Sequence, residues 1–157
     1  MPALLKGHCA VFLDNNTLMV IGGYRFPLSY AETYLLDIST NSWTSGPSLT
    51  TVRSYHTCNL VTNCAGNKQV VVVGGVSTGV TDYTNSVEIY DVDSGTWSAG
   101  NYAFYFICWI ITSENLFVVG NDYPFEVYEH GSAYYNDSFV VIGGYTSDAT
   151  AISSIYL

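Results

Sequence analysis

The three histidines are the first residues of this sequence that could do chemistry, because His is the commonest protein ligand for transition metals. They are His8, His56 and His130. A zinc site needs three or four ligands that converge within ~2 Å of the metal. Here each histidine occupies the same place in a different copy of an internal repeat, and Phe106 fills that place in the remaining copy. This pattern favours histidines that hydrogen-bond within the fold, and we predict no metal site and no cofactor.

The four cysteines could supply a reactive thiol or a disulfide framework, but they include no CxxC pair. An even count does not establish disulfides in a chain of this length. Cys58 and Cys108 fall at equivalent positions of the repeat, where the other copies have Ala10 and Ser132. A catalytic thiol needs a neighbouring base and an electropositive setting, and the sequence shows neither. We therefore expect a free cysteine that packs as a small apolar side chain at a tight inner-strand position.

A repeat of about fifty residues organises the chain. The stretch "GHCAVFLDNNTLMVIGGY" (7–24) aligns with "SYHTCNLVTNCAGNKQVVVVGGV" (54–76), and "YLLDISTNSW" (34–43) aligns with "EIYDVDSGTW" (88–97). Each full copy predicts four short strands joined by polar turns, at 8–13, 17–22, 31–38 and 42–46 in the first and at 55–62, 68–74, 86–92 and 96–99 in the second. Four strands per repeat of this length are typical of a propeller blade.

Composition supports this reading and excludes several functions. The 157 residues are 48% apolar, 15% aromatic and 11% charged, with fourteen Gly and fourteen Tyr, which favours an all-β fold of short strands around one core. A net charge of -9 repels phosphate backbones and anionic lipid, so we expect no nucleic-acid and no membrane binding. The longest apolar run, residues 103–111, is far shorter than the ~20 residues that span a bilayer. The N-terminus lacks a secretory signal pattern, which favours the cytoplasm and leaves the compartment unknown.

The recurring residues resemble the kelch family, whose repeat carries Gly-Gly at the end of the second strand and then Tyr, six residues and Trp. The matching landmarks are Gly22, Gly23, Trp43, Gly74, Gly75, Tyr90, Trp97, Gly120, Tyr128, Gly143, Gly144 and Tyr156. The resemblance implies one domain over 1–157, an incomplete kelch-type β-propeller of two full four-stranded blades and two partial blades. The expected boundaries are 7–47 and 54–100 for the full blades, and 103–129 and 130–157 for the partial ones. We expect the glycines to allow close backbone approach and the tryptophans to pack between blades.

The loops that follow the Gly-Gly pairs vary most between copies, and variable loops on a repeated scaffold are where binding specificity is normally built. In kelch-like propellers these loops and the links between blades gather on one face. Carried over by position, the resemblance predicts a set of partner-binding residues. The set is Tyr24, Arg25, Phe26, Tyr30, Arg53, Ser54, Tyr55, Ser77, Tyr83, Asn121, Tyr123, Tyr145 and Asp148.

The resemblance implies a non-catalytic protein–protein interaction module. Kelch propellers of this kind act as substrate receptors of ubiquitin ligases or as actin-associated scaffolds, roles set by partner domains such as BTB. The alternative is a copper oxidoreductase similar to galactose oxidase, or a fragment of another kelch-fold enzyme. Such a copper site needs two His and two Tyr together, whereas every His here is a repeat landmark, so we expect no catalysis. Because propellers close on themselves, we also expect a fragment, or self-association through open propeller edges.

One irregularity breaks the period: "FVVG" at 117–120 returns as "FVVIGG" at 139–144. Glu129, where the third strand of this copy ends, is followed directly by His130. The fourth strand and the linker that the full copies have at this point are therefore missing. We expect His130 and Gly131 to form a tight turn. Residues 132–135 should then fold back on 125–129 and take the vacant fourth-strand place.

Overall fold

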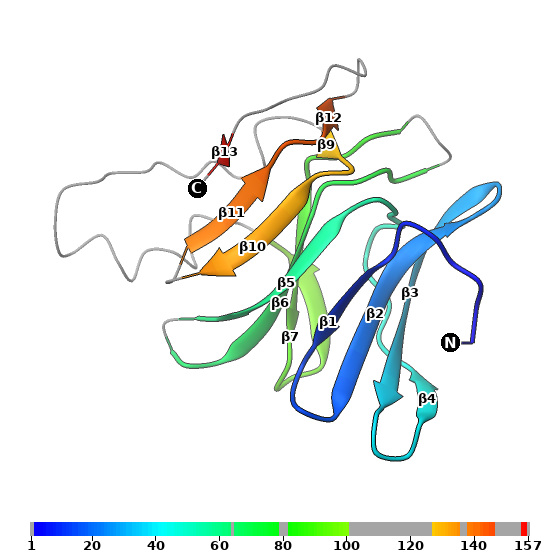
Figure 1. Cartoon of the computed structure of the whole chain (residues 1–157), viewed down its shortest axis with the longest axis vertical. Coiled ribbons are helices and arrows are strands. Elements are labelled where there is room, and N and C mark those ends of the chain that lie inside the picture. Colours follow the sequence, from blue (N-terminus) through cyan, green and yellow to red (C-terminus); the bar gives the residue numbers. More distant parts are fainter. Residues whose placement is uncertain are drawn as a thin grey trace, which may run out of the picture.

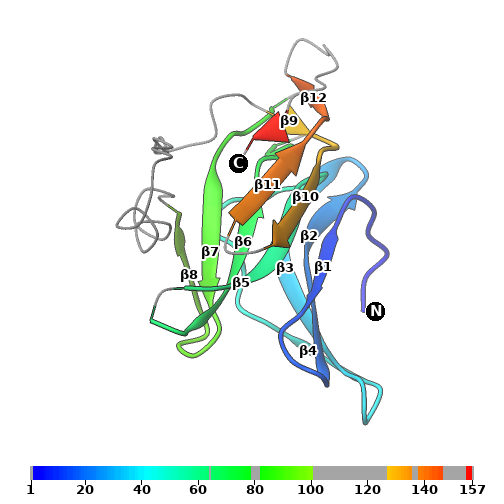
Figure 2. The same cartoon turned by 60° about the vertical axis from the view of Figure 1, so that its left-hand side comes forward.

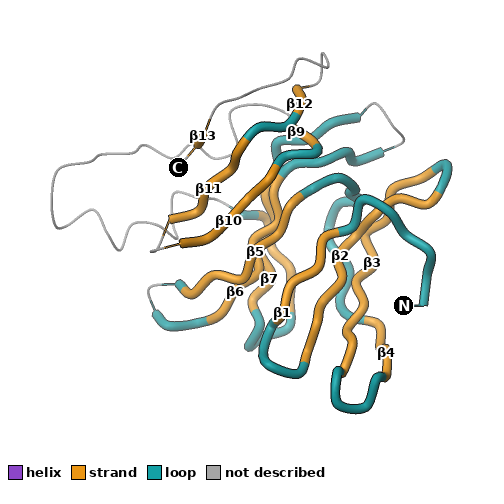
Figure 3. Tube along the Cα trace, in the orientation of Figure 1, coloured by secondary structure: helices purple, strands orange, loops and turns teal. Residues whose placement is uncertain are grey.

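The structure is a computed structural model that describes residues 2–63, 65–78, 82–100, 127–135, 138–146 and 155–156. All regular elements in these ranges are β-strands (Figures 1 and 3). Two four-stranded antiparallel sheets, in the orders β1-β2-β3-β4 and β5-β6-β7-β8, form two complete blades. The predicted all-β architecture with two full four-stranded blades is thereby confirmed. Within the described ranges there is no helix that could cross a membrane.

Blade 1 consists of β1 (Cys9–Phe12), β2 (Thr17–Arg25), β3 (Leu28–Asp37) and β4 (Ser42–Ser45). Its turns are closed by aspartates. Asp14 Oδ1 accepts hydrogen bonds from the N–H groups of Asn16 and Thr17, both at 2.7 Å. Asp37 Oδ1 accepts from Thr40 N–H at 2.8 Å and from Ser39 Oγ at 2.7 Å. These side chains imitate a backbone turn, which is why Asp begins both reversals.

Blade 2 consists of β5 (Thr57–Thr62), β6 (Lys68–Val73), β7 (Val87–Asp91) and β8 (Thr96–Ala99). The four consecutive valines 70–73 of β6 are all buried, because this strand has protein on both faces. Tyr90 of β7 pairs with Trp97 of β8, and their ring centroids are 5.2 Å apart.

The core lies between the two blades. Met19 and Ile21 of blade 1 pack against Val70 and Val72 of blade 2, and these four side chains are fully buried. At ~25 cal/mol per Å² of apolar surface, side chains of this size each contribute about 1.5–3 kcal/mol on burial. Trp97 packs at the edge of this core, and its Nε1 donates to Pro47 O in the link between the blades at 2.9 Å.

A third sheet lies beside blade 2 (Figures 1 and 2). It has the order β10 (Gly131–Tyr135), β11 (Ser138–Ile142), β13 (Ile155–Tyr156). Asn59 Nδ2 of β5 donates to Ser132 Oγ of β10 at 2.7 Å, and Thr57 Oγ1 lies 2.9 Å from His130 Nε2. A separate pair joins β9 (Val127–Tyr128) to β12 (Tyr145–Thr146).

The expectation that residues 132–135 fold back on 125–129 is therefore wrong. Tyr134 pairs with Phe139, so β10 begins a sheet of its own next to β5. Tyr128 belongs to the small β9/β12 pair and has Tyr145 opposite it. The predicted third strand also included residues 125 and 126, which lie outside the described ranges.

The physical reason lies in the residue before each histidine, which adopts the left-handed conformation in all three copies. Gly7, Tyr55 and Glu129 have φ of 61°, 55° and 53°. Tyr55 N–H donates to Gly7 O at 2.7 Å, and Glu129 N–H donates to Tyr55 O at 3.0 Å. The inner strands β5 and β10 are thus each attached by a main-chain hydrogen bond to the start of the inner strand beside them, β1 and β5 respectively. The position of β10 therefore requires no fourth strand or linker immediately before it.

The segment after Gly22-Gly23 differs from the expected loop, because it forms a hairpin. The ladder between β2 and β3 continues through the pairs Tyr24 with Ser29 and Arg25 with Leu28, after a register shift between Ile21 and Gly23. We call residues 23–30 the blade-1 arm. In the sequence, Gly22 and Gly23 indicate the end of a strand. In the structure, their positive φ values of 55° and 116° fit an irregularity within one continuous strand.

Candidate partner-binding face

The blade-1 arm, residues 53–55, residues 76–78 with 82–83, and the β9/β12 pair all lie at the same end of the sheets (Figures 1 and 2). We call this end the loop face. The turns of residues 13–17, 38–41 and 92–95 lie at the opposite end. The loop face holds every predicted binding residue that the structure describes.

The Gly-Gly landmarks support the loop face from below. A Cβ added at Gly22 would lie 2.5 Å from Arg53 O, and one at Gly75 would lie 2.5 Å from Ser54 O. Backbone atoms cannot move aside cheaply, so any side chain at these two positions would push the blade link away. At Gly144 the added Cβ would lie 2.8 Å from the Cβ of His130. A Cβ at Gly23 would lie 3.1 Å from His8 Cβ, and one at Gly75 would lie 2.9 Å from His56 Cβ, so the second glycine of each pair contacts the histidine of its own repeat.

The histidines differ in exposure. His56 is buried, and that burial, with a smaller effect of the Arg53 charge, lowers its pKa to about 3. His130 is buried as well, and loss of solvent lowers its pKa to about 4. His8 is exposed. Within the part of the chain that the structure describes, no group of three or more His, Cys, Asp or Glu could hold a metal.

Cys9 and Cys58 form a disulfide that joins the innermost strands of the two blades, with their Cα atoms 5.9 Å apart. The expectation of a free cysteine at position 58 is therefore wrong. The alignment placed Cys58 opposite Ala10 of the first repeat, but the relevant contact is between adjacent blades, which repeat alignment does not predict. Cys64 and Cys108 lie outside the described residues.

Arg53 is buried completely and holds the link between the blades. Its Nη1 donates to Gly74 O and Ser86 O, both at 3.1 Å, and its Nη2 donates to Ser86 Oγ at 3.0 Å and to Glu88 Oε1 at 2.8 Å. The other carboxylate oxygen of Glu88 accepts from Thr50 N–H at 2.6 Å and Thr50 Oγ1 at 2.7 Å. Burial lowers the pKa of Arg53 and the charge of Glu88 opposes that effect. Because a buried charge is tolerated only when paired and hydrogen-bonded, this network fixes the link on blade 2.

The blade-1 arm exposes aromatic and cationic side chains. Phe26 at its tip is 85% exposed. Arg25 Nη2 donates to Tyr30 OH at 2.9 Å, and the guanidinium lies 4.8 Å from the Tyr30 ring centroid. The hydrogen bond to Tyr30 is the main cause that raises the pKa of Arg25. Lys6 Nζ lies 5.2 Å from the Tyr24 ring centroid on the neighbouring segment, so a second cation lies beside the arm.

Tyrosine rings form two groups on the loop face, one at the arm and one at the β9/β12 pair. The rings of Tyr24 and Tyr55 have centroids 6.4 Å apart. Tyr83 stacks on Tyr128 at 4.5 Å, and Tyr128 stacks on Tyr145 at 5.7 Å. The link between the two groups is the hydrogen bond that joins Tyr55 O to the residue after Tyr128. We call these five residues the tyrosine row. The three stacked rings, Tyr83, Tyr128 and Tyr145, come from three separate segments of the chain.

The kelch motif matches this chain twice, at residues 6–50 and 57–101, and together these matches cover more than half of it. The chain belongs to the kelch-repeat family. A relative, the Kelch repeat-containing protein kel-10 of Caenorhabditis elegans, is 26% identical over 98 residues, which are 62% of this chain and 17% of that protein. The chain thus matches well under two thirds of this relative's length. Kelch repeats generally serve as protein-interaction modules and are typically non-catalytic, and this general class of function is what the match supports.

The predicted partner-binding residues divide into a buried group and a surface group. Arg53 and Ser54 are fully buried and Ser77 is 8% exposed, so their side chains hold the loops in place and offer little surface. Ser54 Oγ lies 2.9 Å from Ser29 Oγ, and Ser77 Oγ donates to Asp82 Oδ2 at 2.8 Å. Tyr24 is buried to 6% exposure, and the surface group is Arg25, Phe26, Tyr30, Tyr55, Tyr83 and Tyr145. Asn121, Tyr123 and Asp148 lie outside the described residues, as does the landmark Gly120.

Two functional residues were missed from the sequence. Lys6 lies in the segment before the first repeat, where no landmark marked it. Glu88 had a signal: it is an acidic residue inside the otherwise apolar run "VEIY", and it is buried. A buried carboxylate requires a partner cation, and only four Lys and Arg residues were available to supply it.

Proposed function

We propose that this chain binds a partner protein through the loop face, with the blade-1 arm and the tyrosine row as the contact surface. The observation that carries the proposal is the exposure of Phe26, at 85%, and Tyr145, at 41%, on one face of a rigid β scaffold. Large aromatic side chains are enriched among the residues that dominate binding energy. Exposed aromatics that gather on one face typically mark an interaction site.

For the biological setting we propose a substrate receptor of a ubiquitin ligase or an actin-associated scaffold. Support for these roles comes from family membership alone. A copper oxidoreductase has less support, because His56 and His130 are both buried and occupy equivalent positions of two different repeats.

The test compares three single variants as bait in a quantitative affinity capture from cells of the source organism. Phe26→Ser and Tyr145→Ser alter the loop face. Ile38→Ser is the matched control, because Ile38 is 46% exposed but directly follows the end of β3 that is remote from the arm. We expect wild type and the Ile38 variant to recover the same partners, and the loop-face variants to lose them at least tenfold. Equal recovery by all four baits would reject the loop face as the binding site. Ligase subunits or actin among the partners would decide the setting.

A second proposal is self-association through the uncovered face of blade 1. Phe12 pairs with Leu18, Leu18 with Leu36, and Leu36 with Trp43, so one apolar row crosses all four strands. The equivalent row of blade 2, Leu60, Val70, Tyr90 and Trp97, packs against blade 1.

In blade 1 this row faces away from blade 2, and Phe12 is 54% exposed. A second copy of the chain supplies a blade of the right shape to cover it. Sedimentation velocity tests this: we expect a concentration-dependent dimer in wild type and a monomer in Phe12→Lys. A wild-type chain that stays monomeric at high micromolar concentration would reject the proposal.

A further inference from the structure

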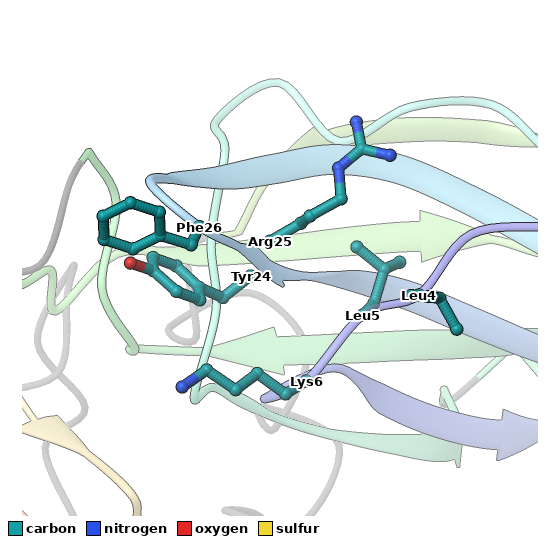
Figure 4. A pocket seen from close by; sticks show the side chains of 6 residues that line it. All are labelled: Leu4, Leu5, Lys6, Tyr24, Arg25 and Phe26. Carbon is teal, nitrogen blue, oxygen red and sulfur yellow. The ribbon is translucent and has the colours of Figure 1, made fainter.

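The residues that line the groove beside the blade-1 arm indicate which kind of partner segment it can bind. The groove is lined by Leu4, Leu5, Lys6, Tyr24, Arg25 and Phe26. Leu4 and Leu5 lie across from Tyr24 and Phe26, and the side chains of Lys6 and Arg25 extend in opposite directions at its two ends (Figure 4). Leu4 is 89% exposed and Phe26 is 85% exposed. The groove is shallow and open, so it suits a short extended segment and does not suit an enclosed small molecule.

The distribution of positive charge is the second observation. The whole chain has only four Lys and Arg residues against thirteen Asp and Glu. Arg53 is buried in its ion pair, which leaves Lys6, Arg25 and Lys68 as the cations at the surface. Two of these three, Lys6 and Arg25, line the same groove, with their charged groups at its opposite ends (Figure 4). Lys68 lies near Leu13 O, at the opposite end of the sheets, at 3.4 Å.

Both groove cations have free hydrogen-bonding capacity. Arg25 is exposed and donates from Nη2 to Tyr30 OH, whereas a guanidinium has five N–H donors in a planar fork. Lys6 is exposed and contacts the Tyr24 ring by a cation–π interaction, which uses none of its three N–H donors as a hydrogen bond. Glu32 is the acidic group whose charge acts on Arg25 from the same blade, as a minor influence compared with Tyr30.

From these observations we infer that the groove binds an acidic, apolar peptide segment of the partner protein. An apolar side chain of the segment covers Leu4, Leu5 and Phe26. Flanking carboxylates pair with Lys6 Nζ and with the Arg25 guanidinium, which favours bidentate carboxylate contacts. Because the rest of the surface is negative, an acidic segment is repelled elsewhere and directed to this groove, which gives specificity more than affinity. This inference rests on the proposed protein-binding function and names the partner's chemistry.

The test pans a displayed library of random dodecapeptides on the full chain and on three variants of it. The double variant Lys6→Glu/Arg25→Glu reverses the charge of the groove. Lys68→Glu is the matched control, with a single reversal at the opposite end. Tyr145→Ser alters the tyrosine row alone. Fluorescence anisotropy then measures the affinity of the enriched peptides for each variant.

We expect wild type, the Lys68 variant and the Tyr145 variant to enrich peptides that combine Asp or Glu with Leu, Ile, Phe or Trp. The double variant should bind these peptides at least tenfold more weakly and should enrich basic, apolar peptides in their place. Enriched peptides without an acidic bias, or with unchanged affinity for the double variant, would overturn the inference. Binding of wild type to vesicles of phosphatidylserine, lost in the double variant, would overturn it in favour of a membrane contact.

The two proposals can fail separately. Peptides or captured partners that depend on Tyr145 but not on Lys6 and Arg25 would overturn the groove inference and keep the loop face as the binding site. A library and an affinity capture that both yield nothing dependent on the loop face would reject both.

Discussion

Arg53 offers the sharpest prediction, because its side chain is inaccessible and all of its neighbours are known. The change Arg53→Met keeps much of the side-chain volume and removes the charge. It deletes four hydrogen bonds and leaves Glu88, whose side chain is 3% exposed, without its cation. Breaking one partner of a buried ion pair typically costs about 3–5 kcal/mol of unfolding free energy. The donors that remain on Glu88, from Thr50 and Thr51, favour a value of about 3 kcal/mol.

Urea denaturation followed by tryptophan fluorescence measures this loss, which is a large part of the 5–15 kcal/mol typical of a domain. Arg25→Met is the matched control: the same substitution at an exposed arginine should leave the unfolding midpoint unchanged. The double variant Arg53→Met/Glu88→Leu should be more stable than the sum of the single losses predicts, since it removes the orphaned carboxylate. An Arg53→Met midpoint equal to that of wild type, or strict additivity in the double variant, would refute the role assigned to this network.

Three further predictions concern the same scaffold. Because burial lowers the pKa of His56 to about 3, the unfolded chain takes up this proton first as the pH falls. The contribution of His56 to the unfolding free energy should be intact above about pH 6.5 and should fall by about 1.4 kcal/mol per pH unit between there and about pH 3. His130, with a pKa of about 4, adds a similar slope, so His56→Gln should reduce the wild-type slope; a variant that keeps the full slope in urea titrations would contradict this. Glu129 has a φ of 53°, a conformation that glycine adopts without steric cost. Glu129→Gly should therefore raise the thermal midpoint, by an amount equivalent to ~0.5–1 kcal/mol, whereas Glu129→Ala should not. Equal midpoints for the two variants would argue against backbone strain at this residue. The Cys9–Cys58 disulfide spans 49 residues of chain, so Cys58→Ser should lower the unfolding free energy by up to about 4 kcal/mol. Peptide mass mapping without reductant tests the bond itself, and two free thiols at these positions would exclude it.

The strand plan of the blades could be predicted from the sequence, because each strand follows a clear local rule. Alternating apolar residues between turns that begin with Asp14 and Asp37 specify both the strands and their ends. The blade-1 arm could not be predicted in this way. Gly22 and Pro27 both read as strand breakers, and only the backbone geometry shows that the ladder passes through the first and turns at the second.

The site was harder to predict than the fold, because its residues act through distant contacts. Arg53 was placed among the binding residues since it lies in a link between blades, where exposed side chains are usual. Its burial depends on Glu88, 35 positions later in the chain. Phe26 and Tyr145 followed from the variability of the loops, whereas Lys6 became visible only when the structure placed it opposite the arm.

The left-handed residues at the start of successive inner strands have a consequence for how such a protein can change over time. Gly7, Tyr55 and Glu129 attach one strand to the next through N–H and C=O groups alone. These hydrogen bonds therefore depend on no side chain, and they do not fix the number of residues between two inner strands. A gene that duplicates, trims or enlarges a repeat can still place the following strand at the correct position around the axis. Kelch repeats joined in this manner can diverge in number and spacing while the scaffold that displays their loops remains the same.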